Sequence, residues 1–242
     1  MHPLSAQQML GVWERGLGQI PLERALALLE AACPELDRGA LAAMSIGQRD
    51  SYLLRLREWT FGPEFVAFST CRGCGQQLEL TLHADHLRHG ADTVPEQRPI
   101  VAGEYRLVLR PLNSLDLISC RKLDTAEMAR TMFARCLISA SSADTALSAD
   151  EIPDEIARSA LDEITRSDPQ ADLEVMVTCE ACQSTTRENF DIISFFWSEI
   201  DRWARRILRE VHVLASCYGW NEADVLSLSS LRRQFYLEMV SA

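Results

Sequence analysis

The strongest pattern along the chain is a stripe of apolar residues in its C-terminal third. Between Phe195 and Tyr218, large apolar side chains recur every three or four residues, while arginine and acidic side chains occupy the opposite side. This spacing predicts one long amphipathic helix, and Gly219 fits its C-terminal end. A stripe of this kind is typical of helix-on-helix packing, although the helix is long enough to offer a partner surface as well.

The same helical spacing is found in two other regions. Near the N-terminus, Pro21 suits the first turn of a helix, and Ser45 is a fitting cap for another. Between residues 111 and 170, Ser114 and Pro153 mark the starts of further helices. Residues 139–148 are small and polar, which favours a mobile loop within this helical segment.

Short stretches with a strand-like pattern lie between the helices. They occur at residues 65–68, 78–82, 104–110, 173–177 and 187–192. The first two of these stretches enclose a tight turn, and so do the last two. The chain is therefore expected to adopt an α+β fold that is mainly helical, with two β-hairpins and a long amphipathic C-terminal helix.

Each predicted hairpin carries a CxxC pair in its turn. Cys71 and Cys74 lie in the first turn, and Cys179 and Cys182 lie in the second. Two such zinc knuckles supply four thiolates, the number that a tetrahedral structural Zn²⁺ requires. The long stretch of chain between the pairs exceeds the usual spacing of a compact ribbon. We therefore predict one split zinc-ribbon-like site built from both hairpins.

Histidines offer an alternative set of ligands close to the first hairpin. His83, His86 and His89 follow one another at every third residue. They could form a second metal site or complete the first knuckle. Because a second CxxC is available, an exposed polar turn is the favoured interpretation.

The remaining cysteines occur singly in apolar helical patterns, which favours core thiols. They are Cys33, Cys120, Cys136 and Cys217. The N-terminus lacks the charged and apolar segments of a signal peptide, and no apolar run approaches the length of a membrane helix. We therefore expect a cytoplasmic protein, in which paired cysteines favour metal over disulfides.

The net charge of −11 argues against a general nucleic-acid binder, because few cations are left to displace counterions from phosphates. No phosphate-binding loop, nucleophile elbow or zinc-protease motif is present in the sequence. A closed four-thiolate site also leaves no open position for a reacting water. The sequence therefore favours a protein that is not an enzyme.

The predicted elements divide the chain into five segments of one compact unit. These are an N-terminal helical region (1–60), the first knuckle and its strands (61–110), a helical insertion (111–170), the second knuckle (171–193) and a C-terminal helical region (194–242). A zinc ion that joins two distant hairpins would couple metal affinity to folding.

Several motifs resemble the base plate protein family of T-even-type contractile phages and related phage-derived injection systems. They are Arg57–Gly62, Cys71-x-x-Cys74-Gly75, Asp168-Pro169-Gln170-Ala171-Asp172, Cys179-x-x-Cys182, Phe195–Ile200, Glu210–Ala215, Tyr218–Glu222 and Arg232–Leu237. The resemblance implies a structural or assembly protein of the baseplate hub, with no catalytic residue. It also implies other tail or baseplate proteins as partners, with action in the cytoplasm during assembly and a possible place in the finished particle.

Aromatic and arginine side chains near the C-terminus are our candidates for the partner contact, because such residues dominate interface energies. They are Tyr218, Trp220, Arg232 and Arg233. Neither a membrane nor a nucleic acid is expected as a partner, and the oligomeric state stays open. Two alternatives are retained: a zinc-ribbon regulator that binds nucleic acid, and a CxxC thiol-disulfide protein.

Overall fold

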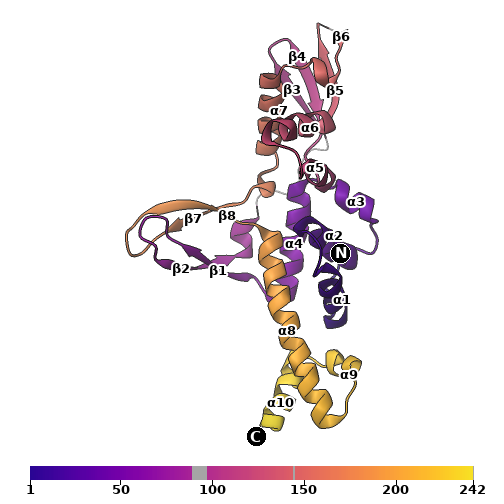
Figure 1. The fold of residues 1–242 in the computed structure, drawn as a ribbon, viewed down its shortest axis with the longest axis vertical. Coiled ribbons are helices and arrows are strands. Elements are labelled where there is room, and N and C mark those ends of the chain that lie inside the picture. The colour runs from indigo at the N-terminus through magenta and orange to yellow at the C-terminus, as the bar shows by residue number, and fades with distance from the viewer. Residues whose placement is uncertain (89–96, 144, 242) are drawn as a thin grey trace. The chain divides into compact units, whose positions relative to one another are not determined.

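The computed structural model describes residues 1–88, 97–143 and 145–241, and it has the expected α+β fold. The chain forms two compact units. One, the helical unit, consists of Met1–Glu35 and Ile192–Ala242, and the other, the central unit, is Leu36–Asp191. Figure 1 shows the helices and the short strands. Within the described part of the chain, no helix is both long enough and apolar enough to cross a membrane.

The helical unit is built along the predicted C-terminal helix. Its elements are α1 (Ala6–Gly16), α2 (Pro21–Ala32), α8 (Ile192–Tyr218), α9 (Glu222–Ser227) and α10 (Ser230–Ser241). The apolar stripe of α8 is buried, including Phe196, Ile200 and Leu214. This burial confirms the prediction of a long amphipathic helix.

Packing between α1 and α8 depends on a close contact. A Cβ on Gly16 would lie 2.2 Å from the Trp197 ring, so glycine lets the two helices approach. The Trp13 indole Nε1 donates a hydrogen bond of 2.9 Å to Asp201 Oδ1. The Arg24 guanidinium lies 4.6 Å from the centre of the Trp197 ring, in the geometry of a cation–π interaction. These contacts fix the face that α8 turns to the N-terminal helices.

The central unit begins with α3 (Arg38–Ala43) and α4 (Ile46–Phe61). Two antiparallel hairpins follow at separate places in the sequence: β1 (Glu64–Thr70) with β2 (Gln77–His83), and β7 (Glu174–Thr178) with β8 (Thr185–Asn189). The short helices η1 (Ala84–Leu87), η3 (Ala149–Glu151) and η4 (Pro169–Ala171) connect larger elements. Both predicted hairpins are thus present.

A four-stranded antiparallel sheet forms the second part of the central unit. Its order is β3 (Arg98–Ala102), β4 (Tyr105–Leu109), β5 (Leu137–Ser142) and β6 (Thr145–Ala146). The accompanying helices are α5 (Ser114–Cys120), α6 (Thr125–Cys136) and α7 (Asp154–Arg166). Side chains from the sheet, α6 and α7 share one apolar core, which includes Leu107, Phe133 and Ile164.

The predicted mobile loop at residues 139–148 is wrong for the part that the structure describes. Residues of this segment belong to β5 and β6, and β5 pairs with β4. Ala140 is buried in the shared core. Only Ala140 is small because of packing, since Ser139, Thr145 and Ala146 are exposed in their strands. Strand pairing, not burial, is what gives this segment its structure.

The Asp168–Asp172 motif connects η4 to two other elements of the central unit. Asp168 Oδ2 accepts a hydrogen bond of 2.9 Å from the Gly47 backbone N–H, in the first turn of α4. Gln170 Nε2 donates a hydrogen bond of 3.0 Å to the Leu87 carbonyl. Asp168 and Gln170 are both buried. The motif that supports the family resemblance therefore has a structural role in this fold.

Asp116 is the centre of a second buried polar network. Its carboxylate accepts hydrogen bonds from Arg110 Nη1 at 2.7 Å, Arg135 Nε at 2.7 Å and the Asn113 backbone N–H at 3.0 Å. Burial opposes ionisation of Asp116, but the hydrogen bonds from both arginines outweigh it and lower its pKa. This network connects α5 to α6 and to the residue that follows β4.

Candidate metal centre

The four predicted cysteines come together in the central unit. Their Sγ atoms all lie within 4.8 Å of one another. Cys71 Sγ is 3.6 Å from Cys182 Sγ, and Cys74 Sγ is 3.6 Å from Cys179 Sγ. Each of these close pairs joins one hairpin to the other. The turns of the β1–β2 and β7–β8 hairpins accordingly lie at the same end in Figure 1.

The first turn has the hydrogen bonds of a knuckle. The Cys71 N–H donates to the Gln76 carbonyl at 2.8 Å, and the Gly75 N–H donates back to the Cys71 carbonyl at 2.9 Å. Gly75 has a φ of 76°, in the left-handed region where glycine has no Cβ penalty. The chain can therefore reverse immediately after the second cysteine.

The second turn repeats this arrangement at equivalent positions. The Cys179 N–H donates to the Ser184 carbonyl at 2.9 Å, and the Gln183 N–H donates to the Cys179 carbonyl at 2.8 Å. Gln183 has a φ of 59°, so a residue other than glycine takes the left-handed position. The two turns thus present two pairs of sulfurs in the same local geometry.

The sulfur separations fit a tetrahedral zinc site. Four sulfurs at about 2.3 Å from one Zn²⁺ would lie about 3.8 Å from one another. The two closest contacts between the hairpins are 3.6 Å, near this tetrahedron edge and far longer than a disulfide of about 2.05 Å. The donor set and its spacing therefore fit a closed Cys₄ metal centre.

Ser184 belongs to the surroundings of these sulfurs, although it was not among the predicted site residues. Its hydroxyl lies 3.3 Å from Cys71 Sγ and 3.1 Å from Cys182 Sγ. The Gly73 backbone N–H donates to Cys71 Sγ at 3.4 Å. These donors can stabilise thiolates. Ser184 could have been found from the sequence, because it lies two residues after Cys182, at the position that Gln76 occupies after Cys74.

Thiol acidity differs sharply within the cluster. The Ser184 hydroxyl and the backbone N–H groups of the turn lower the pKa of Cys71 to about 6. At Cys74 the Gln76 N–H favours the thiolate, but the sulfurs of Cys182 and Cys179 outweigh it and raise the pKa to about 12. Crowded sulfurs resist successive ionisation, and a bound divalent cation would remove that penalty.

Within each pair, the first cysteine faces the interior and the second faces solvent. Cys71 and Cys179 are buried, whereas Cys74 and Cys182 are exposed. Near the cluster, Arg72 Nε lies 3.8 Å from Glu188 Oε1, an ion pair that joins the two hairpins. A metal would therefore lie close to the surface and within reach of a chelator.

His83 and His86 lie outside this sulfur cluster. His83 Nδ1 is 3.3 Å from Asp85 Oδ2, and the rings of His83 and His86 are 6.0 Å apart. His89 falls outside the described residues. Over residues 1–88, 97–143 and 145–241, the four cysteines form the one group with metal-binding geometry.

Three of the other four cysteines are buried, as expected of core thiols: Cys33, Cys120 and Cys136. The prediction was wrong for Cys217, which is exposed in the last turn of α8. Helical spacing there places it beside the apolar stripe and not within it.

The C-terminal candidates lie in the helical unit and have different environments. Tyr218 and Trp220 stack with ring centres 4.8 Å apart, and Tyr236 contacts Trp220 edge-on at 4.9 Å. Arg232 is exposed. Arg233 is only 6% exposed, and its Nε donates to Glu210 Oε2 at 3.0 Å, which joins α10 to α8. Arg233 therefore holds α10 against α8 and is not itself exposed to a partner.

Three further apolar side chains of α10 face solvent. Leu231, Phe235 and Met239 are 63%, 58% and 59% exposed, and their spacing of four residues places them on one side of the helix. Arg233 packs toward α8, so this apolar side of α10 is left facing solvent.

Comparison with known families identifies one match. The family described as T4 bacteriophage base plate protein matches residues 22–197, a range that includes both CxxC pairs and the Asp168–Asp172 motif. Neither a curated protein nor a solved structure matches this chain.

Proposed function

This chain belongs to the T4 bacteriophage base plate protein family, and we propose on that basis that it builds the baseplate of a contractile tail. In this role it is a non-enzymatic structural or assembly protein of the hub of a phage tail or a phage-like injection system. It acts in the cytoplasm during assembly, and the baseplate is its place in the finished particle. The family match over residues 22–197 carries this proposal.

The four cysteines Cys71, Cys74, Cys179 and Cys182 bind one structural Zn²⁺ in this proposal. The convergence of their Sγ atoms within 4.8 Å supports it. Four thiolates fill the coordination sphere, so the metal stabilises the fold and has no open position for catalysis. The ion joins the segment 61–110 to the segment 171–193 across the helical insertion 111–170.

Stability of the central unit follows from this connection. Cys74 and Cys179 are 105 positions apart in the sequence. Cross-linking two points so far apart restricts the unfolded chain, and the metal can bind tightly only when both hairpins have formed. The hairpins thus become one rigid element of the baseplate subunit.

The C-terminal surface of the helical unit contacts other tail proteins in this proposal. It consists of Tyr218, Trp220, Arg232 and the apolar side of α10. Exposed apolar side chains next to aromatic rings and an arginine support this assignment, since such groups provide most of the energy of protein interfaces.

The assembly role is tested by deleting the gene and complementing the deletion with a tagged copy. We expect particles without the protein to lack complete baseplates, and the tagged copy to restore them. Complete and infectious particles in the absence of the protein would contradict the role.

A further inference from the structure

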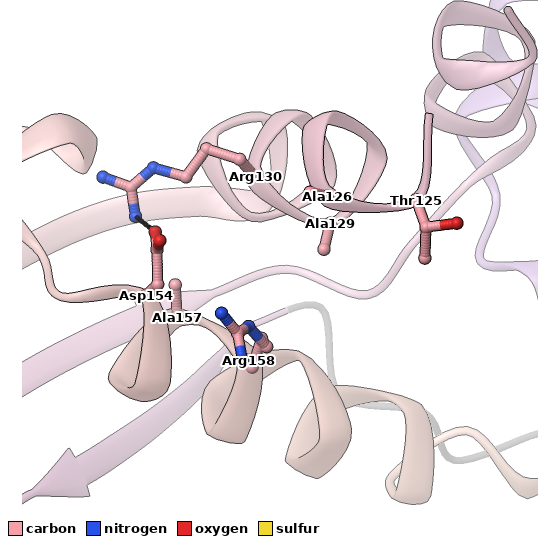
Figure 2. A pocket seen from close by; sticks show the side chains of 7 residues that line it. All are labelled: Thr125, Ala126, Ala129, Arg130, Asp154, Ala157 and Arg158. Carbon is pink, nitrogen blue, oxygen red and sulfur yellow. Dashed lines mark ion pairs between the residues drawn. The ribbon is translucent and has the colours of Figure 1, made fainter. Parts of the chain in front are cut away.

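A hollow of about 460 Å³ lies between α6 and α7 in the central unit. Its floor consists of Ala126 and Ala129 from α6 and Ala157 from α7 (Figure 2). Such a volume is in the range of ligand-binding pockets, which hold a few side chains or a small molecule. The small alanine side chains leave this space unfilled, so the hollow has an apolar floor.

Two arginines, Arg130 and Arg158, and one carboxylate, Asp154, lie at the edge of the hollow. Arg130 donates to the Ile152 carbonyl at 2.9 Å and to the Ala149 carbonyl at 2.6 Å, and it pairs with Asp154 at 3.5 Å. Through these contacts Arg130 joins α6 to the chain before α7 and to the first residue of α7. The charge of Asp154 is therefore compensated by Arg130.

Arg158 provides a second guanidinium at the same hollow. It lies one turn after Asp154 on α7, is exposed, and points toward α6 in Figure 2. Within the described parts of the chain, no hydrogen bond or ion pair engages its side chain. The lining of the hollow thus has two arginines and one carboxylate, in a chain whose net charge is −11.

We propose that this hollow binds an acidic segment of a partner polypeptide, with a glutamate or aspartate carboxylate at Arg158. A guanidinium binds a carboxylate through two parallel hydrogen bonds. The alanine floor then receives the methylene groups and small neighbours of the acidic residue. This inference rests on the proposed baseplate role in one respect: we expect the partner to be another tail protein.

Charge favours this occupant over the alternatives. A free phosphate ion offers nothing to cover the apolar floor, and one uncompensated arginine is a weak site for its double charge. A nucleic acid needs several cations for its row of phosphates, and among the described residues the lining of the hollow has only Arg130, already paired with Asp154, and Arg158. At physiological salt, attraction by Arg158 extends only about 8 Å, so the acidic remainder of the chain does not prevent a local contact.

The test measures binding of short peptides to the full, metal-loaded protein by NMR. The probes are the capped peptide acetyl-AAEAA-amide and its neutral counterpart acetyl-AAQAA-amide. We expect the acidic peptide to shift the amide signals of α6 and α7 around the hollow. We also expect Arg158→Gln to weaken its binding about tenfold, the effect of losing one charged hydrogen-bonding pair.

Arg166→Gln is the matched control, because Arg166 is exposed on the same helix outside the hollow, and it should leave binding unchanged. Equal binding of the neutral peptide, or unchanged binding to Arg158→Gln, would overturn the proposal. Acetate or inorganic phosphate binding as tightly as the peptide would also overturn it, since the site would then recognise small anions. A negative result here leaves baseplate assembly intact, so the two proposals fail separately.

Discussion

Replacement of Gly47 by alanine should strongly destabilise the central unit. An ideal Cβ at this position would lie 1.8 Å from Asp168 Oδ1 and 2.6 Å from Asp168 Cγ. Non-bonded carbon atoms pack best at about 3.5–4.0 Å, so the carboxylate must move away. Its hydrogen bond from the Gly47 N–H is then lost, and the buried carboxylate, whose Oδ1 already has no hydrogen-bond partner among the described residues, loses the one at Oδ2.

The expected effect follows from two terms. Leaving a buried polar group unsatisfied costs about 1–3 kcal/mol, and overpacking a close contact costs about 1–3 kcal/mol. Together they predict that Gly47→Ala lowers the free energy of unfolding by roughly 2–6 kcal/mol. That is a large part of the about 5–15 kcal/mol that stabilises a typical domain.

Urea denaturation followed by circular dichroism measures this loss. Gly11→Ala is the control, because Gly11 is half-buried in α1 and its Cβ would meet nothing closer than Arg15 Nη1 at 3.4 Å. The control should be neutral or stabilising by about 0.5–1 kcal/mol, the helix preference for alanine.

A double-mutant cycle with Asp168→Ala identifies the cause. Removing the carboxylate also removes the clash, so Gly47→Ala should cost little when Asp168 is already alanine. An equal loss in both backgrounds would refute the reasoning, since the contact between Gly47 and Asp168 would then not be its source.

The remaining predictions concern the buried network, the metal centre and the C-terminal surface. Asp116→Asn should lower the free energy of unfolding by about 3 kcal/mol, because it leaves Arg110 and Arg135 without a charged partner. Since the pKa of Asp116 is lowered on folding, its stabilisation is complete at neutral pH and should be lost as the pH falls from about 4 toward the folded value; a flat profile from pH 7 to pH 2, measured by urea denaturation against Asp116→Asn, would contradict this. Ser184→Ala should leave the protein folded but speed zinc loss to a chelator, as seen with a colorimetric zinc indicator, because it removes the single hydroxyl hydrogen of Ser184, which lies within reach of the Cys71 and Cys182 thiolates; an unchanged rate would exclude this role. Trp220→Ala should weaken binding to tail proteins while zinc remains bound, and unchanged affinity in a pull-down from assembling tails would argue against the C-terminal surface.

The hairpins and the long helix could be predicted because their patterns are local. A CxxC pair between two strand-like stretches specifies a knuckle by itself, and the stripe on α8 repeats over many turns. Pairing the two knuckles also needed only the count of thiolates, since one zinc requires four. The four ligands could thus be identified from the sequence, but the path of the chain between the two CxxC pairs could not.

The sheet and the positions of single side chains depended on distant contacts. The small residues of β5 resemble a loop until β4 and β6 pair with them on either side. Arg233 could be recognised as charged, but only the packing of α10 on α8 makes it a buried partner of Glu210. Asp168 shows the same limit, because its role needs Gly47, which lies 121 residues away.

The most direct test of the central claim is zinc K-edge X-ray absorption, combined with elemental analysis, on the purified protein. The account predicts one zinc per chain with four sulfur neighbours at about 2.3 Å, and loss of that signal in Cys182→Ser. A folded protein without zinc, or a metal surrounded by nitrogen and oxygen in place of sulfur, would contradict it.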